Sequence, residues 1–431
     1  MAKIGICLVY IFILNVYCQA DDTTLRLVNL VYRHGDRSPI DIFPTDVNQI
    51  DKWPQGLGWL SQIGIQQHFN LGQLLRQRYV STGFMNSSYS RYQIAIESSD
   101  EDRCLMSAYS NLAGLFYPPD NESRFHPDLP WQPIPVHTRP TYEDNMLNMG
   151  ENCPRYNELL AATMASHAIE KEEIHNKEFY AHVGNLTGWK DENISNIWRI
   201  ADTVFCEKCH NLTDNPWLYD IWNKTTNQTI YDKLRHLESY QFTLLFKGKE
   251  ASMLKGGPLL ARWIQNMKDK ITFPQNNTFK MLMYSGHDTT VSALLTNLGL
   301  FNGVSPQYAS SVVSELHEGQ AGSFYVNLFY KNQTYNDTFV PLTLPGCTFN
   351  CPYDNFIRLT KDAVPTDWRK QCGYPDPQAP NKGGDKLGAG WLVSFALAGL
   401  LVAVLIIFGV CVFRLRRRSD TTLYSKFDIS S

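Results

Sequence analysis

The sequence lacks a large excess of charge of either sign. Its 431 residues carry 39 Lys and Arg against 42 Asp and Glu, which leaves a net charge of −3. A balance this even gives no reason to expect nucleic acid or another polyanion as a partner. Internal repeats and long low-complexity runs are also missing, so nothing indicates a repeat protein or a disordered chain. What remains, with 43% hydrophobic residues, is the composition of a globular protein with a packed core.

Clusters of metal ligands are missing as well. Cys206 and Cys209 have no second ligand pair at the spacing of a zinc site. Together with His210 they match the attachment pattern of haem c, but a secretory chain with many glycosylation sequons does not use that chemistry. A local disulfide is the better interpretation of this pair. Neither a metal nor another cofactor is expected.

Both ends of the chain carry targeting features. Lys3 precedes an apolar stretch, and small residues before Asp21 predict a cleavable signal peptide over residues 1–20, with a spanning anchor as the alternative. Residues 389–413 contain no charge and are long enough to cross a bilayer. Four arginines within residues 414–418 mark the following side as cytoplasmic. We therefore expect a single-pass type I membrane protein with a C-terminal transmembrane helix and a short tail, residues 414–431.

Asn-x-Ser/Thr sequons support a luminal assignment for the part between the two hydrophobic segments. Seven of the ten cysteines also lie there, in an oxidising compartment. The tail contains Tyr424 and Phe427 in the Tyr-x-x-bulky-apolar pattern that adaptor proteins read. We expect delivery to the lysosomal membrane, with the cell surface, or secretion after cleavage of the stalk (residues 373–388), as alternatives. The ten sequons are at Asn86, Asn121, Asn185, Asn193, Asn211, Asn223, Asn227, Asn276, Asn332 and Asn336.

Three segments have the pattern of strand, polar loop and helix. They begin with the apolar stretches 25–32, 92–96 and 280–284, and each is followed by a short polar run and a helical pattern. Nearly continuous apolar strands followed by amphipathic helices predict an α/β fold, with a central, mostly parallel sheet covered by helices on both faces. Ligands bind such sheets at the carboxyl ends of the strands, where all three loops would lie.

The remaining chain predicts a smaller helical cap domain. Residues 151–250 are rich in helix formers, charges and sequons. We interpret them as a cap inserted into an α/β domain of residues 21–150 and 251–372.

The first loop, residues 33–39, reads Arg-His-Gly-Asp-Arg-Ser-Pro. Arg33 and Arg37 supply permanently charged planar groups suited to phosphate oxygens, and His34 between them is a candidate nucleophile toward phosphorus. An incidental surface loop is the alternative. It would require two arginines, a histidine and a glycine to fall within seven positions by chance, which we consider the weaker interpretation.

The second and third loops add side chains of the same kind. The second loop adds Arg103, and the third adds His287 and Asp288. Alone, these residues would be a solvated arginine and a helix cap. Together the loops provide a nucleophile, an arginine cage and a proton donor, which phosphoryl transfer requires.

These motifs resemble those of the histidine acid phosphatases, especially the animal lysosomal and prostatic branch. The resemblance rests on the 33–39 loop and on the segments Trp-Pro-Gln-Gly (53–56), Leu-Met-Ser-Ala (105–108), Trp-Gln-Pro-Ile-Pro-Val-His (131–137), His-Asp-Thr-Thr (287–290) and Leu-Pro-Gly-Cys (344–347). It implies a homodimer of α/β subunits with a helical cap. It also implies that His34 is phosphorylated, that Asp288 protonates the leaving alcohol, and that phosphate is held by Arg33, Arg37, Arg103 and His287.

The chain departs from the family pattern in two places. Glu97 stands where an arginine is expected in an Arg-Ser-Thr-Asp run, and an acid there could change which substrates bind. A serine replaces the expected partner of Cys206 near residues 308–311. By resemblance the disulfides are Cys153–Cys372 and Cys347–Cys351, which leaves Cys206 to bridge Cys209 and Cys104 as the odd thiol.

The resulting hypothesis is an acid phosphatase that hydrolyses phosphate monoesters in an acidic lumen through a phosphohistidine. Neighbouring arginines should keep His34 unprotonated there, and low pH should supply the proton that Asp288 donates. Two alternatives remain. One is a phosphatase specialised for a lysophospholipid, an inositol phosphate or phosphotyrosine. The other is a membrane glycoprotein that binds phosphorylated ligands with little catalysis.

Overall fold

The computed structural model describes residues 24–121 and 123–375. The predicted signal peptide, the predicted span of residues 389–413 and the tail with Tyr424 and Phe427 lie outside the described residues. Within the described ranges, no helix combines the length and the apolar character that crossing a bilayer demands.

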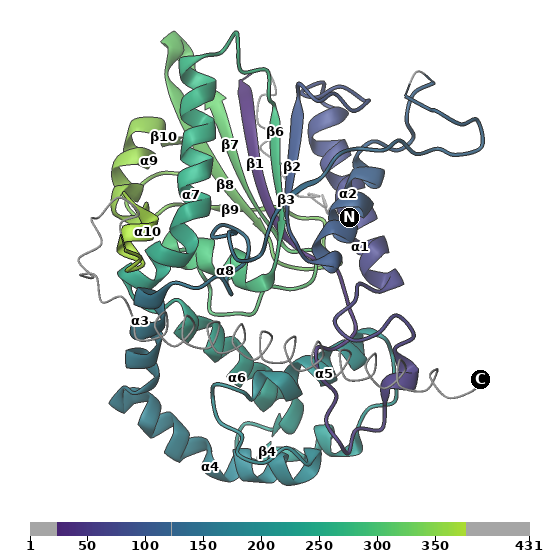
Figure 1. Ribbon diagram of the computed structural model, residues 1–431, viewed down its shortest axis with the longest axis vertical. Helices are drawn as coiled ribbons and strands as arrows, with labels where there is room; N and C mark the ends of the chain where they lie inside the picture. The colour runs from purple at the N-terminus through teal and green to yellow at the C-terminus, as the bar shows by residue number, and fades with distance from the viewer. Residues whose placement is uncertain (1–23, 122, 376–431) are drawn as a thin grey trace, which may run out of the picture. The chain divides into compact units, whose positions relative to one another are not determined.

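Strands and helices alternate at the beginning of the described chain, helices dominate its middle, and most strands of the last part follow one another directly (Figure 1). The strands are β1 (Leu25–Arg33), β2 (Ile94–Ser99), β3 (His137–Arg139), β4 (Ile221–Asn223), β5 (Gln228–Thr229), β6 (Met281–Gly286), β7 (Ser311–Glu318), β8 (Phe324–Lys331), β9 (Val340–Leu342) and β10 (Cys351–Pro352). The helices are α1 (Gln62–Leu75), α2 (Asp102–Leu115), α3 (Pro154–Met164), α4 (His167–Thr187), α5 (Trp198–Cys209), α6 (Ile230–Leu245), α7 (Lys249–Thr272), α8 (Asp288–Asn297), α9 (Tyr353–Thr360) and α10 (Trp368–Gln371).

The main sheet has the strand order β10-β8-β7-β1-β6-β2-β3, with β9 paired to β8. The pairs β1–β6, β6–β2 and β2–β3 are parallel, and the remaining pairs are antiparallel. Since β8 is antiparallel to β7, which is antiparallel to β1, β8 runs in the direction of β1. Five strands (β1, β2, β3, β6 and β8) therefore share one direction, and the predicted α/β fold with a mostly parallel sheet is confirmed. The antiparallel β7–β8 side was not predicted.

Strand β1 is central and buried on both faces, which explains its nearly continuous apolar sequence. Its alternate side chains belong to two different cores. Val28 and Leu30 lie in one cluster, and Leu27 and Val31 lie in the other.

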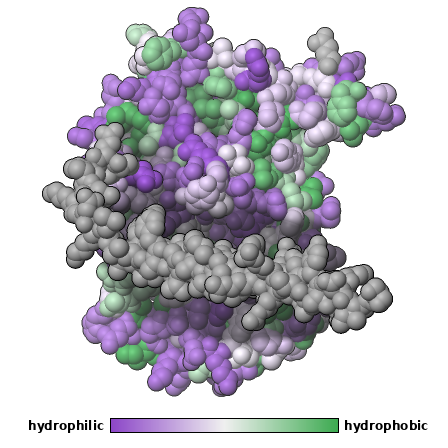
Figure 2. Space-filling model, viewed as in Figure 1, coloured by the Kyte–Doolittle hydropathy of each residue, from purple (hydrophilic) through white to green (hydrophobic). Residues whose placement is uncertain are grey.

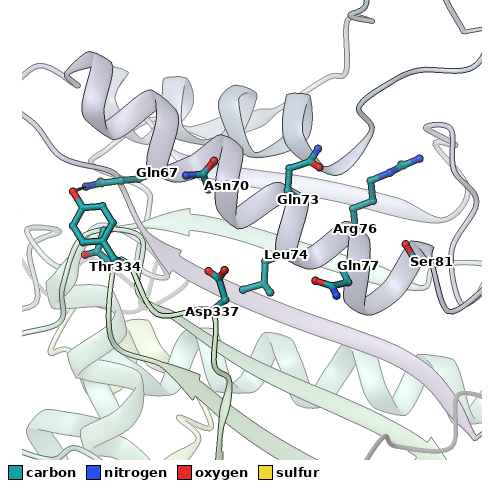
Figure 3. Close-up of a pocket in the computed structure, with 10 residues that line it drawn as sticks. Gln67, Asn70, Gln73, Leu74, Arg76, Gln77, Ser81, Thr334 and Asp337 are labelled. Carbon is teal, nitrogen blue, oxygen red and sulfur yellow. Dashed lines mark hydrogen bonds between the residues drawn. The ribbon is translucent and has the colours of Figure 1, made fainter.

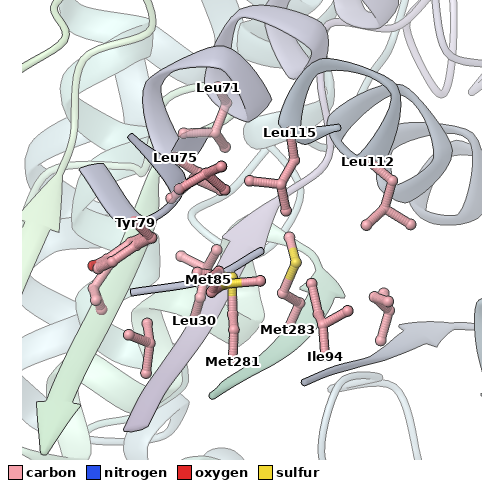
Figure 4. Close-up of a cluster of buried hydrophobic side chains, with 14 of the residues drawn as sticks. Leu30, Leu71, Leu75, Tyr79, Met85, Ile94, Leu112, Leu115, Met281 and Met283 are labelled. Carbon is pink, nitrogen blue, oxygen red and sulfur yellow. The ribbon is translucent and has the colours of Figure 1, made fainter. Parts of the chain in front are cut away.

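Helices cover both faces of the sheet. On one face, Leu71 and Leu75 of α1 and Leu112 and Leu115 of α2 pack on side chains of β1, β2 and β6, as Figure 4 shows. On the other face, α7 and α8 bury residues such as Trp263 against β1, β7 and β8.

The middle of the chain builds a helical segment of its own. Helices α4, α5 and α6 and the small β4–β5 hairpin share a hydrophobic cluster that includes Phe179, Val204 and Leu234. In Figure 1 this segment lies below the sheet. All described residues through Tyr374 form one compact unit, so the division into an α/β domain and a cap stays a prediction.

Two of the expected disulfides are present, Cys153–Cys372 and Cys347–Cys351. The expected Cys206–Cys209 bridge is wrong, because both residues are free thiols, as is Cys104. Both belong to the last turn of α5, but their environments differ. Cys206 is buried with its Sγ 3.2 Å from the hydroxyl of Tyr308, whereas Cys209 is partly exposed.

Most of the predicted glycosylation sites lie on the surface, and their glycosylation stays a prediction. Eight of the ten sequon asparagines are exposed, Asn193 and Asn332 are half-buried, and none is buried. Hydrophilic residues predominate on the face seen in Figure 2, with hydrophobic residues scattered among them.

Candidate active site

The three predicted loops meet at one edge of the sheet. Strand β6 pairs in parallel with both β1 and β2, so the carboxyl ends of the three strands are adjacent. A pocket of about 480 Å³ opens there. Five of the six residues expected to bind phosphate or catalyse its transfer line it, and they are His34, Arg37, Arg103, His287 and Asp288. The sixth, Arg33, contacts Asp288 directly.

His34 follows β1 directly and is only 2% exposed. Its Nδ1 lies 2.8 Å from the carbonyl oxygen of Gly35. Because a carbonyl only accepts hydrogen bonds, Nδ1 carries the proton and Nε2 keeps its lone pair. Burial lowers the pKa of His34 well below its ordinary value, and nearby guanidinium groups, led by Arg33, lower it further. The ring is therefore neutral, as expected, with burial as the larger cause.

The loop that carries His34 is pressed against the start of α1. A Cβ on Gly35 would lie 2.4 Å from the carbonyl oxygen of Gly64, and a Cβ on Gly64 would lie 2.2 Å from that of Asp36. The backbone N–H of Asp36 donates to Gln67 Oε1 at 2.8 Å, and that of Gly35 donates to Ser107 Oγ at 3.0 Å. Only glycine permits this approach, so the position of the loop depends on both glycines.

Arg33 and Asp288 form an ion pair, with Nη2 2.9 Å from Oδ2. The guanidinium also donates to the carbonyl oxygen of Pro306 at 2.6 Å and lies 4.2 Å above the ring of Tyr308. Burial raises the pKa of the Asp288 carboxyl, but the charges of Arg33 and Arg37 outweigh it, so the net pKa is lowered. Asp288 is thus a carboxylate in this geometry.

Arg37 is held by a residue that the sequence did not point to. Its Nη1 and Nη2 each lie 2.9 Å from an oxygen of Asp202 on α5, a bidentate pair that is almost fully buried. The sulfur of Cys206, one turn further along α5, is 3.6 Å from Nη1. The helical segment therefore orients an arginine of the 33–39 loop.

His287 belongs to the third loop and contacts residues of the second. Its Nε2 is 3.1 Å from the hydroxyl of Ser99, at the end of β2, and 3.6 Å from the sulfur of Cys104. Its ring lies edge-on to that of His34, with centroids 5.6 Å apart, and Arg103 Nη2 is 3.5 Å from Nδ1. Burial and the charge of Arg103 lower the pKa of His287 to about 3, so this ring is neutral as well.

The wall opposite the sheet comes from the helical segment. No motif marks its residues, since they are ordinary members of amphipathic helices, and only the packing of α5 and α6 over the sheet edge reveals them. From these two helices the lining residues are Trp198, Asp202, Glu238, Gln241, Phe242 and Leu245.

Glu97, the acid at the position where an arginine is expected, does not line this pocket. It pairs with Arg139 of β3 at 2.9 Å and lines a separate depression together with Arg262 and Asn266. The reason is distance along the strand. Ser99 reaches His287. Glu97 lies two residues before Ser99 on β2, which is a distance of about 7 Å along the strand.

A further depression of about 550 Å³ runs along α1, away from the strand ends (Figure 3). Gln67 lines it together with Thr334 and Asp337 from the loop after β8, and no residue of the predicted site does so. Gln67 connects it to the 33–39 loop, since its Oε1 accepts from the Asp36 N–H and its Nε2 lies 3.4 Å from the hydroxyl of Tyr335.

Comparison with known proteins agrees with this geometry. Residues 24–331 match the model of the histidine phosphatase superfamily, branch 2. The chain belongs to this superfamily. The expected resemblance to the histidine acid phosphatases is thereby confirmed.

Two curated relatives of this histidine phosphatase cover most of the chain. It is 42% identical to lysosomal acid phosphatase from Bos taurus over 386 residues, which is 89% of this chain and 88% of the relative. It is also 42% identical to prostatic acid phosphatase from Homo sapiens over 353 residues, or 81% and 88% of the two chains.

Solved structures share the fold of this histidine phosphatase at low sequence identity. Hafnia alvei phytase in complex with tartrate superposes with a TM-score of 0.62 at 18% identity, covering 82% of this chain and 99% of the phytase. At that identity the likeness shows the fold alone.

Proposed function

We propose that this protein is an acid phosphatase that hydrolyses phosphate monoesters through a phosphohistidine formed on His34. The observation that carries the proposal is the state of His34. Its ring is buried and neutral, its Nδ1 is tied to the Gly35 carbonyl, and its Nε2 is left with a lone pair in a pocket lined by Arg37, Arg103 and Asp288.

The first chemical step is attack on the phosphorus by the lone pair of His34 Nε2. The N–P bond forms as the bond from phosphorus to the ester oxygen breaks. The guanidinium groups of Arg33, Arg37 and Arg103 stabilise the charge on the phosphoryl oxygens. The Nδ1–H···O=C bond to Gly35 favours the ring that becomes positively charged on phosphorylation.

The leaving oxygen needs a proton, and Asp288 is the group placed to give it. Its pKa is lowered while Arg33 and Arg37 face it alone. A bound phosphoryl group brings negative charge between these arginines and the carboxyl, which raises that pKa. At acidic pH the monoester is largely a monoanion, since its second pKa is about 6, so substrate and Asp288 together hold the one proton that the leaving oxygen takes up.

In the second step, water attacks the phosphohistidine. Asp288, now a carboxylate, takes a proton from the water as the new O–P bond forms and the N–P bond breaks. Phosphate leaves with this proton as its monoanion, and neutral His34 and the ionised Asp288 are restored. The acidic optimum follows from the need for one proton at the start of each turnover.

The cellular setting is also a proposal. Relatives of this chain are named lysosomal acid phosphatase, which supports a lysosomal location. We further propose a cleaved signal peptide, glycosylation at the ten sequons, a span over residues 389–413 and adaptor recognition of Tyr424 and Phe427. If Tyr424→Ala leaves lysosomal delivery unchanged in imaged cells, the tail motif has no part in sorting.

The oligomeric state and the division into domains are proposals as well. By resemblance we infer a homodimer, in which an α/β domain of residues 21–150 and 251–372 carries the 151–250 segment as a cap over the pocket. The mass of the purified luminal part can be measured by light scattering. The mass of a monomer would exclude the dimer.

The decisive test of the activity is His34→Ala, assayed with an aryl phosphate near pH 5. We expect kcat to fall by at least about 1,000-fold, because loss of a nucleophile removes the covalent route. Quenching the wild type with labelled substrate should trap the label on His34. His175→Ala, at an exposed histidine of α4, is the matched control and should keep the wild-type rate. A His34→Ala variant as active as the wild type would leave binding of phosphorylated ligands as the better account.

A further inference from the structure

Helix α5 contacts two consecutive residues of the 33–39 loop. Asp202 holds Arg37, as described above. Two turns further along, His210 caps the end of α5 and reaches Asp36, with Nε2 2.5 Å from Oδ1. The Arg37 contact concerns phosphate binding directly, whereas no function described so far uses the Asp36 contact.

Asp36 is completely buried and has few partners for its charge. The hydroxyl of Ser61, which caps the start of α1, donates a short hydrogen bond to the same Oδ1. Among the described residues, Oδ2 has no hydrogen-bond partner. A single carboxylate oxygen thus joins the start of α1 to the end of α5. A buried carboxylate needs such donors, since an unpaired charge away from water is unfavourable.

His210 is well positioned to be a fixed partner. Its side chain is 18% exposed, and its ring packs edge-on against the buried Trp53, with centroids 4.9 Å apart. Its backbone N–H bonds to the carbonyl oxygens of Cys206 and Glu207, as expected of a residue that ends a helix. The ring therefore has little freedom to leave Asp36.

The contact is linked to His34 through one peptide group. The carbonyl of Gly35 and the N–H of Asp36 belong to the same planar unit. That carbonyl accepts the hydrogen bond from His34 Nδ1, and that N–H donates to Gln67. Fixing the Asp36 side chain fixes the tilt of this peptide, which sets the direction of His34 Nε2.

We infer that His210 is a positioning residue, which acts through Asp36 to hold His34 in line for attack on phosphorus. The inference rests on the proposed role of His34 as nucleophile. It makes the helical segment part of the catalytic machinery and not merely a cover over the pocket. It also gives a function to the residue that completes the Cys-x-x-Cys-His pattern at 206–210.

The test compares His210→Gln with His210→Asn. The glutamine amide nitrogen can occupy the place of Nε2 and donate to Asp36, whereas the asparagine side chain is too short. We expect His210→Asn to lower kcat by between about 10- and 100-fold, the range that a misplaced reacting group produces. His210→Gln should stay within about threefold of the wild type.

Binding should be spared in the same variants. Arg33 and Arg37 keep their partners Asp288 and Asp202, so the inhibition constant of inorganic phosphate should change by less than about threefold. The rate of His34 phosphorylation in quenched-flow experiments should fall together with kcat. Lys208→Ala, an exposed change in the same turn of α5, is the control and should keep the wild-type kcat.

A double variant tests whether His210 acts through Asp36. Asp36→Asn should lower kcat to the same degree, and Asp36→Asn combined with His210→Asn should be no worse than either alone. Asp36→Asn also serves if His210→Asn fails to fold, as judged by its melting temperature. Equal kcat in His210→Asn and His210→Gln, or additive losses in the double variant, would overturn the inference. A wild type without phosphatase activity would instead overturn the proposed function.

Discussion

Three contacts restrain the side chain of Arg33 next to the pocket. Its guanidinium contacts the Asp288 carboxylate, the Pro306 carbonyl and the Tyr308 ring. Its planar group is thus preorganised to donate to phosphoryl oxygens, at little cost in side-chain entropy. The same contact keeps Asp288 ionised, so the proton donor of the proposed reaction is charged until a phosphoryl group offsets the arginines.

Asp288→Asn tests this relation between charge and proton donation. The amide keeps the shape of the side chain but cannot protonate the leaving oxygen. We expect kcat with an alkyl phosphate to fall by between about 100- and 10,000-fold, the usual contribution of a general acid. The loss with an aryl phosphate, whose leaving group needs little protonation, should be much smaller. Equal losses with both substrates would exclude Asp288 as the donor.

The pH profile of the wild type checks the source of the proton. Because the pKa of Asp288 is lowered in the structure, the free carboxyl holds no proton near pH 5, and the substrate monoanion must bring it. We therefore expect kcat/KM to decline above about pH 6, where the monoester loses its second proton. A profile that stayed flat to pH 8 would contradict this account.

Helices α1 and α2 approach each other at backbone distance, and glycines make this possible. A Cβ on Gly72 would lie 2.0 Å from the carbonyl oxygen of Asn111, and one on Gly114 would lie 2.0 Å from that of Phe69. These helices carry residues of the site, since α1 starts against the 33–39 loop and α2 starts with Arg103 in its first turn. Close packing of two elements therefore sets the distance between two loops of the site.

Gly114→Ala tests the packing of these two helices. Alanine is the better helix former by about 1 kcal/mol, yet its methyl group has no space against α1. We expect a net destabilisation of roughly 1–3 kcal/mol, as for other overpacked sites, measured as the free energy of unfolding in denaturant. Ser110→Ala, one turn earlier on the same helix and only half-buried, is the control and should change stability by less than about 0.5 kcal/mol. A more stable Gly114→Ala protein would show that α1 can move away.

At the scale of the whole described unit, one disulfide joins distant parts of the chain. Cys153, at the start of α3, is bonded to Cys372, at the end of α10, over a sequence separation of 219. The second disulfide, Cys347–Cys351, joins residues with a sequence separation of only 4. The long closure restricts the unfolded chain far more than the short one.

Replacing each pair of cysteines by serine compares the two closures. From loop entropy we expect Cys153→Ser/Cys372→Ser to lower stability by about 5 kcal/mol and Cys347→Ser/Cys351→Ser by about 2 kcal/mol. Melting temperatures of the two variants and the wild type, measured under identical conditions, provide the comparison. A greater loss in the short-loop variant would mean that local packing, not loop length, governs the stabilisation.

The α/β fold class and the residues that meet at the sheet edge were predictable from local sequence patterns. Strands at 25–33, 94–99 and 281–286 each show in the local pattern of apolar residues. Parallel pairing then brings the loops that follow them together, so the convergence of His34, Arg103 and Asp288 is predictable without coordinates. Short-range hydrophobic periodicity and the ordering of parallel strands carry that information.

The surroundings of those residues depend on long-range packing. Asp202 and His210 contact the 33–39 loop because α5 packs across the sheet edge, and nothing in the local pattern of α5 marks that face. Cys206 stays apart from Cys209 because it is buried against Tyr308, a contact more than a hundred residues away along the chain. Glu97 pairs with Arg139 outside the pocket because it lies further back along β2 than Ser99. Each depends on which side of an element meets a distant partner, which sequence periodicity does not encode.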